Sequence, residues 1–293
     1  MAQENRVVKD SMRGMTLPDY ARHTPLVATV LGQNPGPFTG PGTNTYLLGR
    51  GARPLLLDTG QGVARYGEIL ATALEELCSS HTLDRIVLTH AHIDHIGGVT
   101  QVRERFGELA VLKLPWPEKD TAAGVTPTVL HDGDLIGGEG VTLRAIFTPG
   151  HAPDHLCYYL EEEGAVFTGD VVLGAGTTVI PDDTGDLGQY MASLRRLLEL
   201  QPARIYPAHG PVVEKAPDKI REYIAHRELR DRQILEALLH GPLQVEEIVR
   251  RIYTDVPVSL HPAAARSVRS HLKKLNGEGR VMMEEAGFWR LSR

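Results

Sequence analysis

The chain has 293 residues, of which 42% are hydrophobic, and is long enough to bury a sizeable core. No apolar run reaches the roughly 18 to 20 residues that a membrane-spanning helix needs, so we expect no membrane partner. The N-terminal stretch lacks the apolar segment of a signal peptide, which favours a cytoplasmic location. The formal net charge is −6, but residues 214–293 hold 15 Lys and Arg against 12 Asp and Glu. This local basic excess is the candidate contact for a polyanion.

The first two thirds of the chain alternate between strand-like and helix-like patterns. We expect an N-terminal extension over 1–25 and one catalytic domain over 26–213. The elements expected in its first half are strands near 27–30, 43–48, 54–58 and 85–89 and a helix over 63–77.

Four metal-binding side chains follow the apolar run 85–89 within six residues: His90, His92, Asp94 and His95. Because a buried strand ends where they begin, the side chains are expected on a strand-end loop. Their spacing points to two metal ions. Neutral imidazoles favour zinc, although a mixed set with carboxylates leaves iron and manganese open.

Three further polar residues come just after apolar strands, each held by a Pro or Gly turn. His151 follows the strand 141–147, Asp170 follows 165–168, and His209 follows 204–206. A single histidine at a strand end is more often structural than ligating. The repetition of one placement by five histidines and two aspartates instead predicts a metal centre.

The motifs THxHxDHxGG (89–98), TPGH (148–151), TGD (168–170) and the late His-Gly (209–210) resemble those of the metallo-β-lactamase superfamily. The resemblance implies an α/β fold, an αββα sandwich with metals at one edge. It also implies one metal held by His90, His92 and His151, and a second held by Asp94, His95 and His209. Asp170 would bridge the two ions.

A narrower resemblance, to the β-lactamase-like protein 2 group, is carried by residues 34–37 (NPGP), 42–47 (GTNTYL) and 206–211 (YPAHGP). The presence of Asp170, where dedicated zinc β-lactamases have Cys or Ser, makes antibiotic hydrolysis an unexpected main activity. The group contains single-strand-specific endoribonucleases and, in fungi, thioesterases acting on acyl-carrier substrates. The shared motifs do not separate these two activities.

The C-terminal part reads as a connecting helix within 214–240 and a winged-helix-like domain over 241–293. The winged-helix assignment rests on two predicted short helices followed by a hairpin with a glycine turn. One interpretation of its basic side chains is a nucleic-acid contact, and the other is a solvated face of a domain that caps the site or forms a homodimer. The residues concerned are Arg266, Arg269, Lys273, Lys274 and Arg280.

The leading functional hypothesis is a di-zinc endoribonuclease on single-stranded RNA, in which two zinc ions per chain share a nucleophilic hydroxide. Asp94 would orient the hydroxide and pass a proton to the leaving group. The alternative is a thioesterase or esterase with an apolar pocket near Trp116, Val179 and Tyr190. A third hypothesis is a nucleic-acid- or protein-binding regulator with a vestigial hydrolase.

Three further residues complete the expected site. Asp58 ends an apolar strand and is the candidate partner for the second ring nitrogen of a ligating histidine. Asn44 and His155 are candidates for substrate contact.

Overall fold

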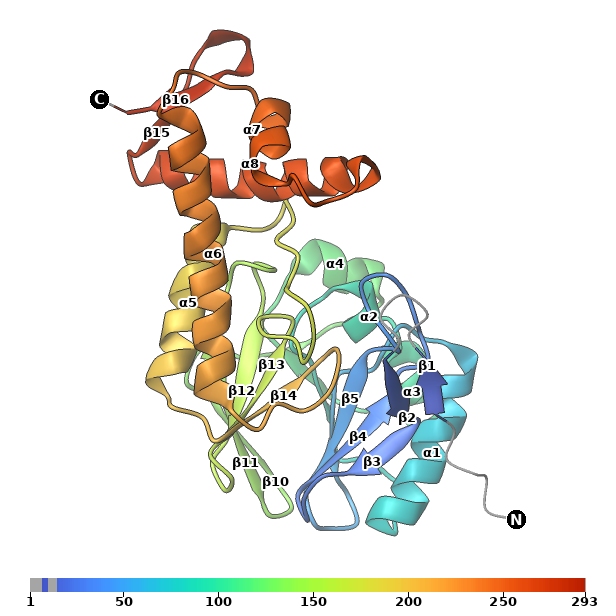
Figure 1. Cartoon of the computed structure of the whole chain (residues 1–293). Helices are drawn as coiled ribbons and strands as arrows, with labels where there is room; N and C mark the ends of the chain where they lie inside the picture. Colours follow the sequence, from blue (N-terminus) through green and yellow to red (C-terminus); the bar gives the residue numbers. More distant parts are fainter. Residues whose placement is uncertain (1–6, 10–14, 293) are drawn as a thin grey trace. The chain divides into compact units, whose positions relative to one another are not determined.

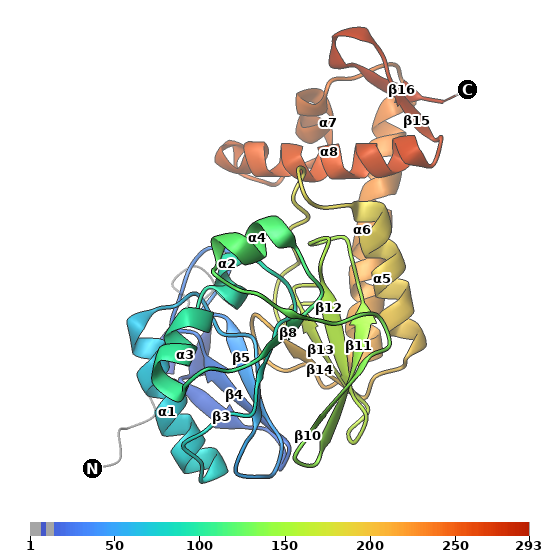
Figure 2. The ribbon, with the colours of Figure 1, turned by 180° about the vertical axis from the view of Figure 1, so that it is seen from behind.

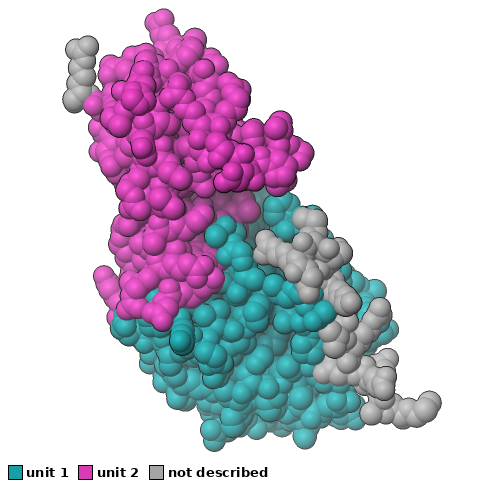
Figure 3. Space-filling model, in the orientation of Figure 1, with its two compact units in different colours: residues 1–148, 154–177, 201–217 teal, residues 149–153, 178–200, 218–293 magenta. Residues whose placement is uncertain are grey.

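The structure is a computed structural model of the chain, in which residues 7–9 and 15–292 are described (Figure 1). It divides into two compact units, shown in separate colours in Figure 3. Unit 1 comprises residues 1–148, 154–177 and 201–217, and unit 2 comprises 149–153, 178–200 and 218–293.

Unit 1 contains a seven-stranded sheet whose strands follow chain order. The pairs from β3 to β6 are antiparallel, and those from β6 to β9 are parallel. The strands are β3 (Tyr20–Arg22), β4 (Val27–Leu31), β5 (Asn44–Leu48), β6 (Leu55–Leu57), β7 (Ile86–Val87), β8 (Val111–Lys113) and β9 (Thr128–Val129). The pairing of β3 with β4 shows that the expected N-terminal extension already supplies a strand of this sheet. Before it, β1 (Val7–Lys9) pairs with β2 (Thr16–Pro18).

The second sheet of unit 1 has five strands, also in chain order. Its last pair, β13 and β14, is parallel, and the others are antiparallel. The strands are β10 (Leu135–Gly138), β11 (Val141–Phe147), β12 (Leu156–Leu160), β13 (Ala165–Gly169) and β14 (Arg204–Pro207).

The core of unit 1 lies in two layers. One layer joins the sheets, where Tyr46 and Leu57 of the first sheet pack with Phe167 and Tyr206 of the second. The other lies between the first sheet and its helices, which Figures 1 and 2 show on its outer face. Helix α1 buries residues spaced three or four apart, as a helix with one apolar face must. The helices are α1 (Ala64–Cys78), α2 (Ile93–Ile96), α3 (Val99–Phe106) and α4 (Pro117–Ala122).

Unit 2 is mainly helical and ends in a short hairpin. The last two helices and the hairpin enclose an apolar core, which confirms the predicted winged-helix domain. No helix among the described residues combines the length and apolar character that crossing a membrane requires. The elements are α5 (Leu187–Glu199), α6 (Ala216–Leu238), α7 (Val245–Ile252), the 3₁₀ turns Val258–Leu260 and Glu285–Gly287, α8 (His261–Gly277), β15 (Val281–Met283) and β16 (Trp289–Leu291).

The two units differ from the domain division expected from the sequence, because α5 and α6 belong with the winged helix. Asp231 of α6 lies 2.6 Å from His271 Nδ1 and 2.7 Å from Lys274 Nζ, both on α8. Arg195 of α5 contacts Glu228 of α6 at 3.3 Å. These contacts make α6 part of the C-terminal unit rather than a separate connector.

A buried ion cluster braces the part of unit 1 that surrounds the histidines. Lys113 Nζ at the end of β8 lies 2.7 Å from Asp120 of α4 and 3.0 Å from Asp154, and all three side chains are buried. Asp120 also accepts a hydrogen bond from the Trp116 backbone N–H at 2.7 Å. Burial raises the pKa of Asp154, although Lys113 opposes this effect. The cluster therefore fastens the Trp116 loop to the segment between β11 and β12.

We predict that Lys113→Met lowers the free energy of unfolding by about 3–5 kcal/mol, because two carboxylates then lose their buried cation. Denaturant unfolding followed by circular dichroism measures this change. Lys215→Met, at an exposed lysine of the same unit, serves as the control and should change stability by less than about 0.5 kcal/mol. Equal effects of the two substitutions would contradict the bracing role.

Candidate metal centre

The predicted ligands occupy loops that follow strands. His90 and His92 come after β7, Asp94 and His95 lie in the short helix α2, and His151 follows β11. Asp170 comes directly after β13, and His209 follows β14. The parallel pairing of β13 with β14 brings the last two residues to the same edge of the sheet.

The structure gathers all seven residues into two groups of potential ligand atoms. In each group, the ligand atoms lie within 4.8 Å of one another. The first group is His90, His92, His151 and Asp170, and the second is Asp94, His95 and His209.

Asp170 faces both groups. Its Oδ1 lies 3.1 Å from His209 Nε2 and 3.5 Å from His95 Nε2, both in the second group. Asp94 Oδ2 faces the same two nitrogens, at 3.3 Å from His209 and 3.4 Å from His95. Two carboxylates thus point at one pair of imidazoles, an arrangement suited to cations.

The combined attraction between these carboxylates and imidazoles shifts their pKa values more than burial does. Burial alone would lower the pKa of His209, but Asp170 and Asp94 raise it to about 9. Burial likewise opposes the raised pKa of His95, for which Asp94, Asp58 and Asp170 are responsible. The carboxyls behave conversely: burial would raise the pKa values of Asp94 and Asp170, but the imidazoles hold both well below the ordinary value.

Three of the candidate ligand histidines, His90, His95 and His151, have a partner at Nδ1. His95 Nδ1 lies 2.8 Å from Asp58 Oδ2, and Asp58 is the residue that the sequence suggested as a partner for a ligating histidine. Thr89 donates its hydroxyl proton to Asp58 and can accept from His90 Nδ1 at 3.0 Å. Sequence reasoning did not single out Thr89, although it precedes His90 directly in the motif. Within unit 2, His151 Nδ1 lies 2.8 Å from the carbonyl of Val179. These contacts fix the rings with Nε2 available for a ligand.

His155 lies beneath the ligands instead of at an open surface. Its Nε2 accepts the backbone N–H of Asp170 at 3.2 Å, so Nδ1 carries the proton and donates to Thr148 Oγ1 at 3.0 Å. The ring is fully buried, 4.8 Å from that of His90. A side chain at Gly169 would come within 2.5 Å of His155 Nε2. These contacts place His155 as a support for Asp170, not as the substrate contact considered from the sequence.

Asn44 is also buried and engaged with the backbone. Its Nδ2 donates to the carbonyls of Pro207 and Gly210, at 2.9 and 2.8 Å. Its backbone N–H donates to Ala208 at 2.6 Å. Because both amide protons are used, Asn44 braces the loop that carries His209 and does not face substrate through them.

The five basic residues proposed for nucleic-acid contact are not equivalent. Lys274 is nearly buried and lies 2.7 Å from both Asp231 and Glu278. Arg269 lies 3.7 Å from Asp182, and Arg280 lies 3.8 Å from Glu278. Arg266 and Lys273 are exposed on α8. The structure therefore pairs three of the five cations with carboxylates.

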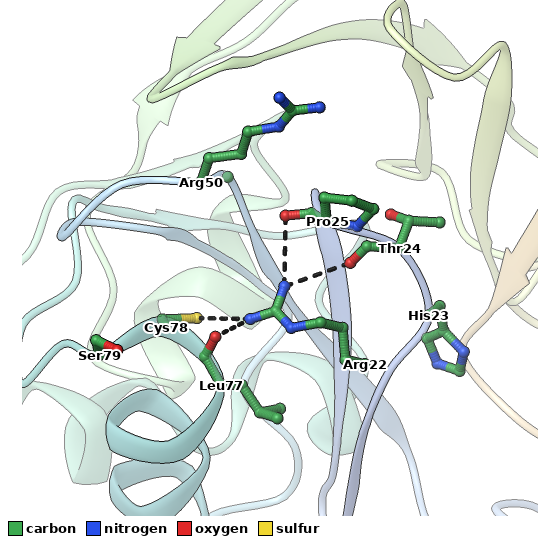
Figure 4. Close-up of a pocket in the computed structure, with 9 residues that line it drawn as sticks. Arg22, His23, Thr24, Pro25, Arg50, Leu77, Cys78 and Ser79 are labelled. Carbon is green, nitrogen blue, oxygen red and sulfur yellow. Dashed lines mark hydrogen bonds between the residues drawn. The ribbon is translucent and has the colours of Figure 1, made fainter.

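A separate hollow of about 740 Å³ in unit 1 contains none of the ligand residues (Figure 4). Arg22 lies at its centre and donates to the carbonyls of Thr24, Pro25 and Leu77. The guanidinium thus joins the end of α1 to the turn after β3. Its engagement with the backbone indicates a structural role for this arginine.

The residues of the centre fit a pair of transition-metal ions. Imidazole nitrogens and carboxylate oxygens are the donors that zinc, iron and manganese accept. His95 Nε2 is buried and has no hydrogen-bond partner among the residues that the structure describes. An uncompensated polar nitrogen that faces two carboxylates is explained by a cation between them. The fold and the donor set together define a metal-dependent hydrolase with a two-sheet sandwich.

Comparison with known proteins agrees with this class. The family model of the metallo-beta-lactamase superfamily matches residues 38–209, and that of the beta-lactamase associated winged helix domain matches residues 245–289. The chain belongs to the metallo-beta-lactamase superfamily, as the sequence motifs predicted.

Similar proteins extend over most of the chain. A beta-lactamase-like protein 2 homolog of Caenorhabditis elegans is 41% identical, covering 87% of this chain and 85% of that protein. An atrochrysone carboxyl ACP thioesterase of Claviceps purpurea is 39% identical, covering 92% of this chain and 86% of that protein. The crystal structure of a beta-lactamase domain protein from Burkholderia ambifaria is similar in fold, with a TM-score of 0.79 at 20% identity, and covers 98% of this chain and 97% of that chain.

We predict that Asp58→Ala weakens metal binding 10- to 100-fold, because His95 loses the carboxylate that orients its ring. Titration of metal-depleted protein against a fluorescent zinc chelator measures the affinity. Asp84→Ala removes a partly exposed carboxylate of the same unit and should leave the affinity within about twofold. An unchanged affinity in Asp58→Ala would exclude the supporting role.

Proposed function

We propose that the chain is a di-zinc hydrolase of thioester or ester bonds, acting on an acyl group attached to a carrier protein. The observation that carries this proposal is the similarity to a carrier thioesterase over 92% of the chain. The complete set of seven ligand side chains supports a catalytic rather than a vestigial centre.

The proposed reaction needs a nucleophile, a polarised carbonyl and a proton donor. When bound, two metal ions would provide a hydroxide at neutral pH and Lewis acidity toward the carbonyl oxygen. Water oxygen adds to the carbonyl carbon, the bond to sulfur or oxygen breaks, and the leaving atom takes up a proton. Asp94 is the proposed group that orients the attacking oxygen and delivers that proton. Asp170 is the proposed bridge between the two ligand groups.

Apolar side chains adjoin the ligands in each unit. The Trp116 ring is partly exposed, with its centroid 6.3 Å from that of His92 in unit 1. Val179, whose carbonyl lies beside His151 in unit 2, has an exposed side chain. Tyr190 was also expected to line the acyl pocket, but it is fully buried with Arg227 over its ring. We therefore propose Trp116 of unit 1 as a contact for an acyl group, and we no longer propose Tyr190.

Cleavage of single-stranded RNA uses the same metal chemistry and is the competing proposal. It depends on cations that can contact phosphates. Arg269, Lys273 and Lys274 line a hollow of about 650 Å³ in unit 2, but Asp182, Asp186 and Glu278 line it as well. This balance of charge favours the thioester proposal over a nuclease.

We predict metal-dependent release of thiol from an aromatic acyl thioester of N-acetylcysteamine, and a loss of at least about 100-fold in turnover for Asp94→Asn. A thiol-reactive dye records turnover, and the metal content of each preparation is measured in parallel. Glu108→Gln, at an exposed surface position, controls for the effect of substitution in itself and should match the unaltered protein, whereas activity remaining in metal-depleted Asp94→Asn would reveal a contaminant.

An end-labelled, unstructured RNA is incubated with the same preparations. Metal-dependent RNA cuts that disappear in Asp94→Asn, without any thioester hydrolysis, would overturn the proposal in favour of the nuclease. Thioester hydrolysis that persists in Asp94→Asn with metals bound would contradict the role of Asp94.

A further inference from the structure

The contacts described so far leave Asn34 and Thr43, in the segments 34–37 and 42–47, without an assigned role. Thr43 contacts Asp94 directly, and Asn34 contacts Thr43. Thr43 Oγ1 lies 3.1 Å from Asp94 Oδ2, the oxygen that also faces His95 and His209. Thr43 is fully buried and Asn34 nearly so.

The direction of each hydrogen bond follows from the donor and acceptor types. The backbone N–H of Thr43 donates to Asn34 Oδ1 at 2.9 Å, which fixes the orientation of the amide. Asn34 Nδ2 then donates to Thr43 Oγ1 at 3.0 Å. Because the ionised carboxylate of Asp94 can only accept, the Thr43 hydroxyl proton points to Asp94 Oδ2. The amide occupies a lone pair of the hydroxyl and leaves its proton for the carboxylate.

The backbone around Asn34 is shaped for this contact. Gly42 has a φ of +149°, and a Cβ there would lie 3.3 Å from Asn34 Oδ1 and 3.2 Å from Leu31 Cγ. A side chain at position 42 would therefore crowd the amide that aligns Thr43.

We propose that Asn34 and Thr43 are positioning residues that hold Asp94 Oδ2 toward the second ligand group. Oδ2 receives the hydroxyl proton and faces two imidazoles, whereas Oδ1 accepts no hydrogen bond from the described residues. The two oxygens would thus have separate tasks: Oδ2 would hold a metal ion when one is bound, and Oδ1 would remain for the proton. The assignment of Oδ1 rests on the proposed hydrolysis, but that of Oδ2 concerns metal binding alone.

Metal titration tests the assignment of Oδ2 without any substrate. Metal-depleted protein is titrated with Co²⁺ in competition with a chelator, and the visible absorption of the bound ion is recorded. Thr43→Val keeps the shape but removes the proton, so one of the two metal affinities should fall 10- to 100-fold with a changed spectrum. Thr43→Ser restores the hydroxyl and should recover most of the affinity.

Two further variants separate positioning from a general loss of packing. Thr45→Val removes a buried hydroxyl of β5, two residues after Thr43. This hydroxyl donates to Val30 O and contacts Tyr66 away from the ligands, so metal binding should be unchanged. Asn34→Asp keeps the size but offers only acceptor oxygens to Thr43 when ionised. The hydroxyl proton is then diverted from Asp94, so metal affinity should fall although Thr43 is present.

Wild-type affinity and an unchanged cobalt spectrum in both Thr43→Val and Asn34→Asp would overturn the proposal. Equal losses in Thr43→Val and Thr45→Val would also overturn it, because packing would then be the cause. Since no substrate is used, these outcomes stand whether or not the chain hydrolyses thioesters.

Discussion

The structure depends on the concentration of charge at one edge of the two sheets. Asp94 and Asp170 point their oxygens at the same two imidazole nitrogens, those of His95 and His209. Burying such like charges together is costly unless cations accompany them. Surrounding residues hold three of these groups in place: Asp58 contacts His95, Asn44 holds the His209 loop, and His155 accepts the backbone N–H of Asp170. The contacts that make the loops rigid are thus the same ones that hold the candidate ligands in position for metal.

Local signals in the sequence were sufficient to select the seven side chains that the structure brings together, and to predict several elements. The strand at Val141–Phe147 could be predicted because its apolar residues alternate with polar ones. The helices of the winged domain could be predicted because their apolar residues recur every three or four positions. The roles of Asn44 and His155 could not be predicted, because a polar residue beside a ligand suggests substrate contact until its burial is known. The contacts of Thr43 and Thr89 could not be predicted for a similar reason, because the sequence does not indicate which group a threonine hydroxyl will bond to. The division into two units also depends on tertiary contacts, such as that of Asp231 with His271.

In the C-terminal unit, ion pairing determines which basic residues are available to contact a polyanion. A count of charges favours a polyanion contact, but Lys274 is paired with Asp231 and Glu278 within its own unit. Ion pairs of this kind stabilise the packing of α6 against α8 and leave fewer cations for phosphate. The same reasoning favours an acyl substrate over RNA, since a thioester needs apolar contacts and a polarised carbonyl more than a basic track.

Anomalous diffraction from crystals of the zinc-loaded protein, recorded on both sides of the zinc absorption edge, tests the central claim most directly. We predict two zinc peaks per chain, one at roughly 2.0–2.2 Å from His90, His92 and His151 and the other at similar distances from Asp94, His95 and His209. Asp170 should contact both ions. A single peak, or two peaks of which one lies away from these residues, would contradict the two-metal centre.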